Sequence, residues 1–218
     1  MPTQQCLADA ALLKKKTAYD IVKGLKGILA DIENGTLHID MEAEDIHTFI
    51  EGELTKRIGD NGKRLHTSRS RNDQVAVDIK LYLKKEVVNV KNLVVGLIKV
   101  IADKAEKYSE TVMPGYTHLQ RAQPITFGHH LLAYGEMLLR DVSRLEDCLK
   151  RMDEMPLGSC ALAGTTYPID RTITAKLLGF DRITNNSLDG VSDRDYCIEF
   201  ASVLSIIMVH LSRFSEEI

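Results

Sequence analysis

The stretch TFGHHLLAYGEMLLRDVSRLEDCLKRMDE, residues 126–154, decides the fold. Small or apolar residues recur along it at alternating steps of four and three. These residues are Leu131, Gly135, Leu138, Val142, Leu145, Leu149 and Met152. Such an alternation keeps one continuous stripe on one face of an α-helix, and striped helices pack side by side in long bundles. The stretch therefore predicts a long helix with one face packed against similar helices.

Two other segments, roughly 75–107 and 194–218, show the same alternation. The stripe of the first consists of Leu83, Val87, Val90, Val94, Leu97 and Ile101. The stripe of the second consists of Phe200, Leu204, Ile207, Leu211, Phe214 and Ile218. All three segments exceed the usual three turns of a globular helix. The pattern predicts an all-α fold, and because lone helices cannot bury such stripes, we expect a bundle shared between subunits.

The last stripe is still in phase at Ile218, and no Gly, Asn or Pro stop signal accompanies it. We therefore expect the chain to be the front part of a longer protein. The alternative is a natural C-terminal helix that frays at its end.

Residues 1–65 have a different pattern, with shorter helical periodicities at about 6–16, 17–33 and 42–58. Two turn-rich stretches, ENGTLHID and GDNGKR, interrupt them. We expect a small helical N-terminal domain over 1–65 and a central helical-bundle domain over 66–218. Within the second domain, residues 156–193 are expected to be mostly loop and short helix.

Composition excludes several classes of protein. Apolar residues make up 44% and charged residues 27% of the chain, as in soluble globular proteins. The formal net charge of −3 gives no reason to expect nucleic acid or an anionic membrane as partner. The four cysteines form no CxxC pair, and neither a signal peptide nor a membrane span is evident. These features predict a cytoplasmic protein.

One polar stretch, KRLHTSRSRNDQ at residues 63–74, gathers basic, hydroxyl and amide side chains in an acidic chain. Guanidinium forks and hydroxyls near a helix start suit a carboxylate or phosphate ligand. The alternative is a helix N-cap with solvated charges, in which Ser70 or Asn72 caps the helix expected to begin near residue 75. No aromatic residues interleave with the charges, which argues against nucleic acid.

A second polar stretch, MPGYTHLQRAQP at residues 113–124, lies between two of the long helical segments. It is either a solvated connector or a polar site that the helices hold in place. An imidazole next to an anion-binding group suits proton abstraction beside a carboxylate. No zinc motif, Walker sequence or dinucleotide fingerprint is present, so we expect neither metal nor organic cofactor.

Several stretches together resemble the argininosuccinate lyase family of the fumarase/aspartase superfamily, which is close to the delta-crystallins. They are LHTSRSRNDQVAVDIKLYLK, MPGYTHLQRAQPITFGHHLLAYGEMLLRD, PLGSCALAGTTYPIDR and NNSLDGVSDRDYCIEF. The resemblance covers the chain from about residue 20 onward. It implies a long-helix bundle that assembles as a homotetramer, with each active site drawn from three subunits. The implied reaction is the β-elimination of argininosuccinate to arginine and fumarate without a cofactor.

The resemblance also implies roles for individual residues. His118 is the implied catalytic residue. The implied substrate-binding residues are Asn72, Thr117, Ser70, Arg71 and Gln120. The implied accessory residues are His47, Asp45 and Arg194. For Asp45 and Arg194 the alternative is an ion pair that only orients His47.

The chain also departs from this family. Ser68 stands where such sequences usually have Gly, and we expect it to be tolerated if the backbone does not need a positive φ. The opening segment that supplies a Ser and an Asp to the substrate is missing. The 218 residues also lack the flexible loop whose serine is thought to remove the Cβ proton. We therefore expect the chain alone to be inactive.

Two other functions stay open on the sequence alone. One is a non-enzymatic, crystallin-like structural protein of the same fold, since motifs can persist after activity is lost. The other is a sister lyase, such as an adenylosuccinate lyase, although GYTHLQRAQP favours the arginine pathway.

Overall fold

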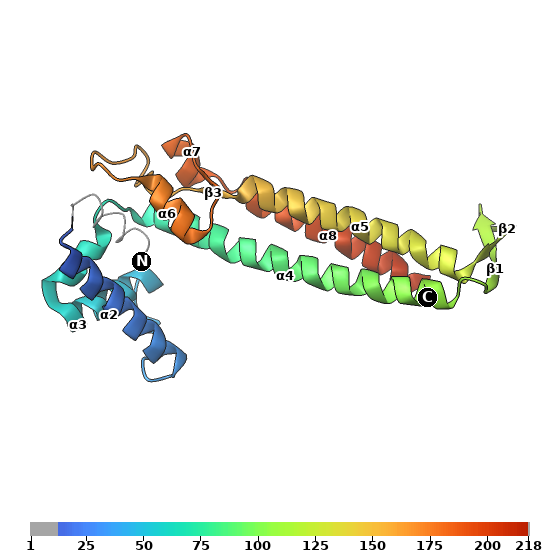
Figure 1. Cartoon of the computed structure of the whole chain (residues 1–218), viewed down its shortest axis with the longest axis horizontal. Helices are drawn as coiled ribbons and strands as arrows, with labels where there is room; N and C mark the ends of the chain where they lie inside the picture. Colours follow the sequence, from blue (N-terminus) through green and yellow to red (C-terminus); the bar gives the residue numbers. More distant parts are fainter. Residues whose placement is uncertain (1–12, 218) are drawn as a thin grey trace. The chain divides into compact units, whose positions relative to one another are not determined.

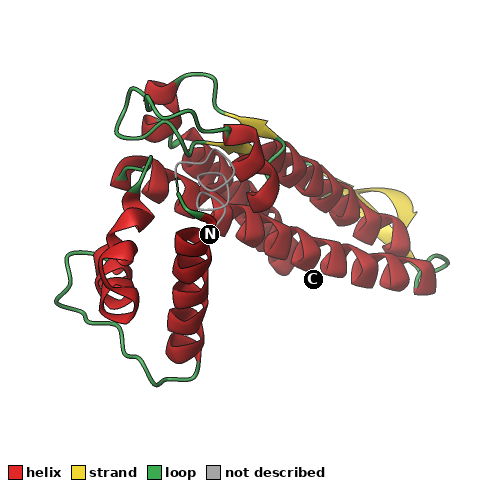
Figure 2. Cartoon of the chain, turned by 60° about the vertical axis from the view of Figure 1, so that its left-hand side comes forward, coloured by secondary structure: helices red, strands yellow, loops and turns green. Residues whose placement is uncertain are grey.

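The computed structural model describes residues 13–217, and most of them are helical (Figures 1 and 2). In chain order the elements are α2 (Lys15–Glu33), α3 (Ile46–Ile58), η1 (Gly59–His66), α4 (Arg71–Lys107), β1 (Val112–Thr117), β2 (Gln120–Thr126), α5 (Phe127–Met152), β3 (Glu154–Met155), α6 (Arg171–Leu178), β4 (Arg182–Ile183), α7 (Ser187–Ser192) and α8 (Asp195–Glu216). Residues 6–12 of the helical pattern expected at 6–16 lie outside the described residues.

The chain forms two compact units. The first, here called the N-terminal unit, comprises Met1–Asp78 and Glu154–Asp193. The second, the bundle unit, comprises Ile79–Asp153 and Arg194–Ile218. This division differs from the expected boundary at residue 65, because the loop after α5 returns to the start of α4 and is hydrogen-bonded there. Helix α4 begins in the N-terminal unit and continues into the bundle unit.

In the bundle unit, α4, α5 and α8 run side by side (Figure 1). Each of the three predicted stripes contributes to one apolar core, so the helical pattern is confirmed. The buried core residues include Val87, Val94, Ile101, Leu131, Leu138, Leu145, Phe200, Val203 and Ile207. Helix α8 has the length and apolar composition of a membrane-crossing helix. One of its faces lies in this core, as expected for a helix of a bundle.

The stretch at 113–124 is an antiparallel β-hairpin rather than the expected irregular connector. Strand β1 pairs with β2 in a register that sets Thr117 opposite Gln120. The two residues between them, His118 and Leu119, have φ values of 51° and 59°. Positive φ at both turn positions defines the tight turn whose twist matches that of a hairpin. The prolines and polar side chains concealed this strand pairing in the sequence.

Gly115 lies where the hairpin register shifts. A Cβ atom at this position would come within 2.8 Å of the backbone oxygen of Gln123. The close approach of the two strands therefore requires glycine at residue 115.

In the N-terminal unit, α2, α3 and η1 pack around a small apolar core. Its buried members are Leu13, Ile21, Ile28, Leu54 and Leu65. Strands β3 and β4 form a short parallel pair. Arg171 joins this pair to the preceding loop, since its guanidinium donates to the backbone oxygens of Leu157 at 2.7 Å and Thr184 at 2.9 Å. This scaffold holds the loop that contacts the start of α4.

Candidate active site

The N-terminus of α4 is capped by two hydrogen bonds that involve Ser70. The Ser70 hydroxyl accepts from the backbone N–H of Asn72 at 3.3 Å, and the Asp73 carboxylate accepts from the backbone N–H of Ser70 at 3.0 Å. The Ser70 hydroxyl thus caps the second helical residue, and the side chain of Asp73, the third, binds back to the N-cap backbone as in one half of a capping box. Ser70 is therefore a helix cap, and α4 begins at Arg71 rather than near residue 75.

Asp73 also holds the loop that follows α5. Its side chain is completely buried. Its second carboxylate oxygen accepts from the backbone N–H groups of Gly158 at 3.0 Å and Cys160 at 2.8 Å. Burial raises the pKa of Asp73, while these backbone donors lower it. The side-chain amide of Asn72 donates to the backbone oxygen of Ala161 at 3.0 Å, so Asn72 is oriented by the same loop.

The backbone is strained on both sides of this contact. Ser68 and Cys160 have φ values of 54° and 53°. Ser68 is 9% exposed, and its hydroxyl has no hydrogen-bond partner within residues 13–217. The condition under which serine was expected to be tolerated at this position is therefore not met. A left-handed backbone favours glycine at residue 68.

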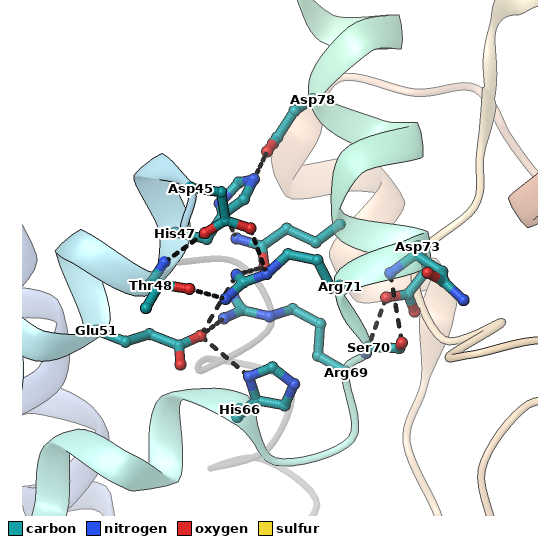
Figure 3. Close-up of polar contacts among 12 residues, drawn as sticks. Asp45, His47, Thr48, Glu51, His66, Arg69, Ser70, Arg71, Asp73 and Asp78 are labelled. Atoms are coloured by element: carbon teal, nitrogen blue, oxygen red, sulfur yellow. Dashed lines mark hydrogen bonds and ion pairs between the residues drawn. The ribbon is translucent and has the colours of Figure 1, made fainter. Parts of the chain in front are cut away.

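His47 lies near the start of α3 and contacts two side chains of α4 (Figure 3). Its Nδ1 is 2.7 Å from the amide nitrogen of Gln74, and its Nε2 is 3.3 Å from a carboxylate oxygen of Asp78. Burial lowers the pKa of His47, the Asp78 carboxylate raises it, and the Arg71 guanidinium lowers it. The imidazole is thus held at both nitrogens.

Arg71 is surrounded by partners from α3 and from its own helix. Its Nε lies 3.0 Å from the Asp45 carboxylate, and its terminal nitrogens donate to the Thr48 hydroxyl at 3.2 Å and the Gln74 side-chain oxygen at 3.0 Å. Asp45 also caps α3 by accepting from the backbone N–H of Thr48 at 2.6 Å. That backbone donor and the charge of Arg71 lower the pKa of Asp45. Arg71 therefore serves the α3–α4 contact, and the ion-pair partner of Asp45 is Arg71.

Glu51 completes the network. One of its carboxylate oxygens lies 3.0 Å from Nδ1 of His66 and 3.3 Å from a terminal nitrogen of Arg69 (Figure 3). Sequence reasoning did not select Glu51, His66, Asp73, Gln74 or Asp78. A signal was present for two of them, because Arg71, Gln74 and Asp78 recur at steps of three and four and so share one helix face.

The bundle unit carries the other implied residues on the hairpin. Thr117, His118 and Gln120 are all exposed. His118 occupies the first position of the turn, where its backbone has positive φ. Beside the hairpin lies a cleft of about 670 Å³, whose lining includes Thr117, His129, Arg213 and Glu217. The turn thus presents an imidazole on a short, exposed arm.

The predicted site residues therefore form two groups, one in each unit. The N-terminal unit brings together Asp45, His47, Ser70, Arg71 and Asn72. The bundle unit brings together Thr117, His118 and Gln120. Arg194 lies at the N-terminus of α8 in the bundle unit, and its link to His47 stays a prediction. Residues 13–217 contain no group of three His, Cys, Asp or Glu side chains arranged to hold a metal ion.

Known proteins resemble the chain over nearly all of its length. The argininosuccinate lyases of Desulforamulus reducens and Clostridium beijerinckii are 57% and 58% identical over 212 residues, which is 97% of this chain and 46% of each relative. An EDDS lyase variant with bound fumarate is 31% identical, with a TM-score of 0.89, over 99% of this chain and 42% of that protein. The chain thus spans under half the length of these relatives.

The family comparison agrees with the fold. The helical bundle with its small helical N-terminal part is the fumarase/aspartase type of architecture that the sequence predicted. A family model described as lyase matches residues 3–218. The chain belongs to this lyase family.

Proposed function

We propose that the protein to which this chain belongs is an argininosuccinate lyase, which cleaves argininosuccinate to arginine and fumarate. The similarity to argininosuccinate lyases at 57–58% identity supports this substrate. The EDDS lyase variant with bound fumarate supports a fumarate product. Its identity of 31% is lower than that of the argininosuccinate lyases. It therefore supports the type of reaction more than the identity of the amino-acid part of the substrate.

The observation that carries the proposal is the strained, exposed turn at His118. A non-glycine residue at positive φ costs roughly 1–3 kcal/mol and tends to occur where function needs that geometry. The turn has two such residues in succession, and Leu119 is 94% exposed, so burial of that side chain does not offset the cost within one copy. The turn holds the His118 imidazole exposed at the tip of the hairpin.

In the proposed reaction, a proton leaves Cβ of the succinyl group and the bond from Cα to the guanidino nitrogen breaks. A base takes the proton, and the electron pair of the broken C–H bond forms the C=C bond of fumarate. The guanidino nitrogen leaves with the electron pair of the C–N bond and takes up a proton, which gives arginine. Negative charge develops on the succinyl carboxylate during proton loss and requires nearby donors. We assign His118 to polarising or activating the reacting groups, and Asn72, Thr117, Ser70 and Gln120 to binding the substrate.

The role of Arg71 in this proposal differs from the substrate contact that the resemblance implies. Its guanidinium is engaged with Asp45, Thr48 and Gln74. We therefore assign Arg71 to orienting the start of α4 and its neighbour Asn72, rather than to holding a substrate carboxylate directly. His47 and Asp45 keep the accessory role, and Arg194 stays their proposed partner.

We further propose that the active site is shared between subunits of a homotetramer. Asn72 lies in the first turn of α4, and the hairpin follows its last turn. The resemblance to argininosuccinate lyases implies that these two groups of residues come together from different copies. Exposed apolar side chains along the bundle provide a surface for such assembly. They include Leu93, Val100, Ile198, Met208 and Val209.

We place this enzyme in the cytoplasm, with small-molecule ligands and without nucleic acid or membrane partners. The three cysteines within the described residues, Cys148, Cys160 and Cys197, are all free thiols, as a reducing compartment favours.

A chimera tests the proposal. This chain would replace the matching 212 residues of the Desulforamulus reducens enzyme, with which it is 57% identical. Argininosuccinate cleavage, followed by the ultraviolet absorbance of fumarate, is expected in the chimera and lost by more than about a hundredfold in His118→Asn. A folded chimera that releases no fumarate from argininosuccinate, or one in which His118→Asn is fully active, would contradict the proposal. Adenylosuccinate as an alternative substrate distinguishes the sister lyase.

A further inference from the structure

The side chains around His47 determine where its proton resides. Its Nδ1 lies 2.7 Å from the amide nitrogen of Gln74, within hydrogen-bonding distance. An amide nitrogen only donates hydrogen bonds, so Nδ1 must accept and carries no proton. The proton of the neutral imidazole is then on Nε2, from which it points to the Asp78 carboxylate 3.3 Å away.

The orientation of the Gln74 amide is set in turn by Arg71. The side-chain oxygen of Gln74 accepts from a terminal nitrogen of Arg71 at 3.0 Å. An arginine guanidinium has donors only. If the amide turned by half a rotation, its NH₂ group would face those donors and its oxygen would leave Arg71. Arg71 therefore fixes Gln74, and Gln74 fixes the tautomer of His47.

We propose that Gln74 is a positioning residue that holds His47 neutral, as the Nε2–H tautomer, in a relay that runs from Arg71 through Gln74 and His47 to Asp78. All four side chains belong to the N-terminal unit, and Figure 3 shows His47 between the start of α3 and the face of α4.

A protonated His47 would disrupt this relay. Its Nδ1 would then donate, and it would meet the NH₂ group of Gln74, with no acceptor available unless the amide gave up Arg71. The charged groups near His47 are Asp78, Asp45, Arg71 and Arg69. The two carboxylates favour the imidazolium, whereas the two guanidinium groups and burial of the ring oppose it. The amide of Gln74 adds a geometric constraint against the charged form.

The relay gives Gln74 a role in the proposed reaction, and this consequence rests on the proposed function. Arg71 and Asn72 share the first turn of α4. A changed charge at His47 would therefore move the guanidinium of Arg71, which orients Asn72, the implied substrate-binding residue. The tautomer of His47 itself does not rest on any activity.

The experiment is nitrogen NMR of the chain labelled with ¹⁵N-histidine. The chain has seven histidines, and the signals lost in His47→Gln identify those of His47. In the wild type at neutral pH, we expect Nδ1 to give the signal of an unprotonated ring nitrogen and Nε2 that of an N–H. In Gln74→Glu, whose carboxylate accepts from both Arg71 and His47, we expect Nδ1 to become protonated. The pH at which His47 takes up a proton should rise by about one to three units.

Two further variants isolate the effect. Gln74→Met removes both hydrogen bonds at similar volume. The Nδ1 signal should shift because it loses its donor, while Asp78 still accepts from Nε2–H. Asn89→Asp adds the same negative charge on the exposed face of the same helix, and it should leave the His47 signals unchanged. A wild-type His47 that is charged or carries its proton on Nδ1 at neutral pH would overturn the inference. So would identical His47 signals in the wild type and in folded Gln74→Glu and Gln74→Met.

The same substitutions in the chimera test the effect of Gln74 on catalysis. Gln74→Glu is expected to lower kcat/KM about tenfold or more and to shift the acidic limb of its pH profile, while Asn89→Asp is not. An inactive wild-type chimera with the expected NMR signals would count against the proposed function alone. An active chimera whose pH profile is the same with Gln74→Glu would count against the catalytic role of Gln74.

Discussion

Ser68→Gly is expected to stabilise the protein. Ser68 has a φ of 54°, and this left-handed conformation costs an L-residue roughly 1–2 kcal/mol. Its buried hydroxyl lacks a partner within residues 13–217, which costs about 1–3 kcal/mol. Glycine gains more freedom in the unfolded chain, which offsets about 0.4–1 kcal/mol. We expect a net increase in the free energy of unfolding of about 1–4.5 kcal/mol.

The measurement is urea and thermal unfolding of the chain, followed by circular dichroism. For a chain of this size, 1 kcal/mol corresponds to a rise in Tm of about 2–4 °C. Ser68→Ala separates the two contributions, because alanine removes the hydroxyl and keeps the backbone strain. The variant with glycine should therefore be more stable than the variant with alanine.

Ser202 provides the matched control. It is exposed within α8, where its hydroxyl donates to the backbone oxygen of Ile198 at 2.8 Å. In a helix interior, glycine is less stable than alanine by roughly 0.5–1 kcal/mol. Glycine should therefore be more stable than alanine at residue 68 and less stable than alanine at residue 202. If glycine is the less stable of the two at residue 68 as well, the reasoning about backbone strain is wrong.

Three other perturbations follow from the contacts described above. Asp73→Asn should lower the free energy of unfolding, measured in urea, by about 2–4 kcal/mol, because one amide oxygen cannot accept from all the backbone N–H groups that the two carboxylate oxygens bind. An unchanged midpoint of urea unfolding would contradict the role of Asp73. His47 has a folded pKa below its ordinary value of 6.5, so the unfolded chain binds the proton first, and stability is lost as pH falls from about 6.5 through the folded pKa. The difference in unfolding free energy between wild type and His47→Gln should therefore shrink on acidification over that range, and a constant or growing difference would refute this. Leu119→Gly should relieve positive φ at the exposed turn and leave Tm equal or higher, as measured by thermal unfolding; a clear fall in Tm would argue against a strained turn.

The helical bundle was predictable because its determinants are local. The stripes of three segments specify which face of each helix is buried, and the core uses those faces. The ends of α5 and α8 were also close to expectation. The start of α4 lay four residues earlier than expected, because hydrogen bonds of Ser70 with Asn72 and Asp73 cap the helix at this point.

The hairpin was not predictable from periodicity. Its strands, VMPGYT and QRAQPIT, are interrupted by Pro114 and Pro124 and show no regular alternation of apolar and polar residues. The turn residues His118 and Leu119 lack the Asn-Gly type of signal that usually marks such a hairpin. The pattern of hydrogen bonds between β1 and β2 overrides these weak local preferences.

The candidate site was predictable only in part. The implied residues Asp45, His47, Ser70, Arg71 and Asn72 do lie together in the N-terminal unit. Their contacts are between side chains far apart in sequence, and single-sequence reasoning gives no distances. The resemblance implied a substrate contact for Arg71. In the structure its guanidinium contacts Asp45, Thr48 and Gln74, and its role toward the substrate stays a prediction.

The most direct test of the shared site combines two defective chimeras. Asn72→Ala and His118→Asn would each be prepared alone and then co-assembled, and fumarate release from argininosuccinate would be measured. If a site takes Asn72 from one copy and His118 from another, mixed oligomers contain some sites with neither substitution, and they should recover a clear fraction of wild-type activity. Mixed oligomers that stay as inactive as the two parents, beside an active wild type, would contradict the account.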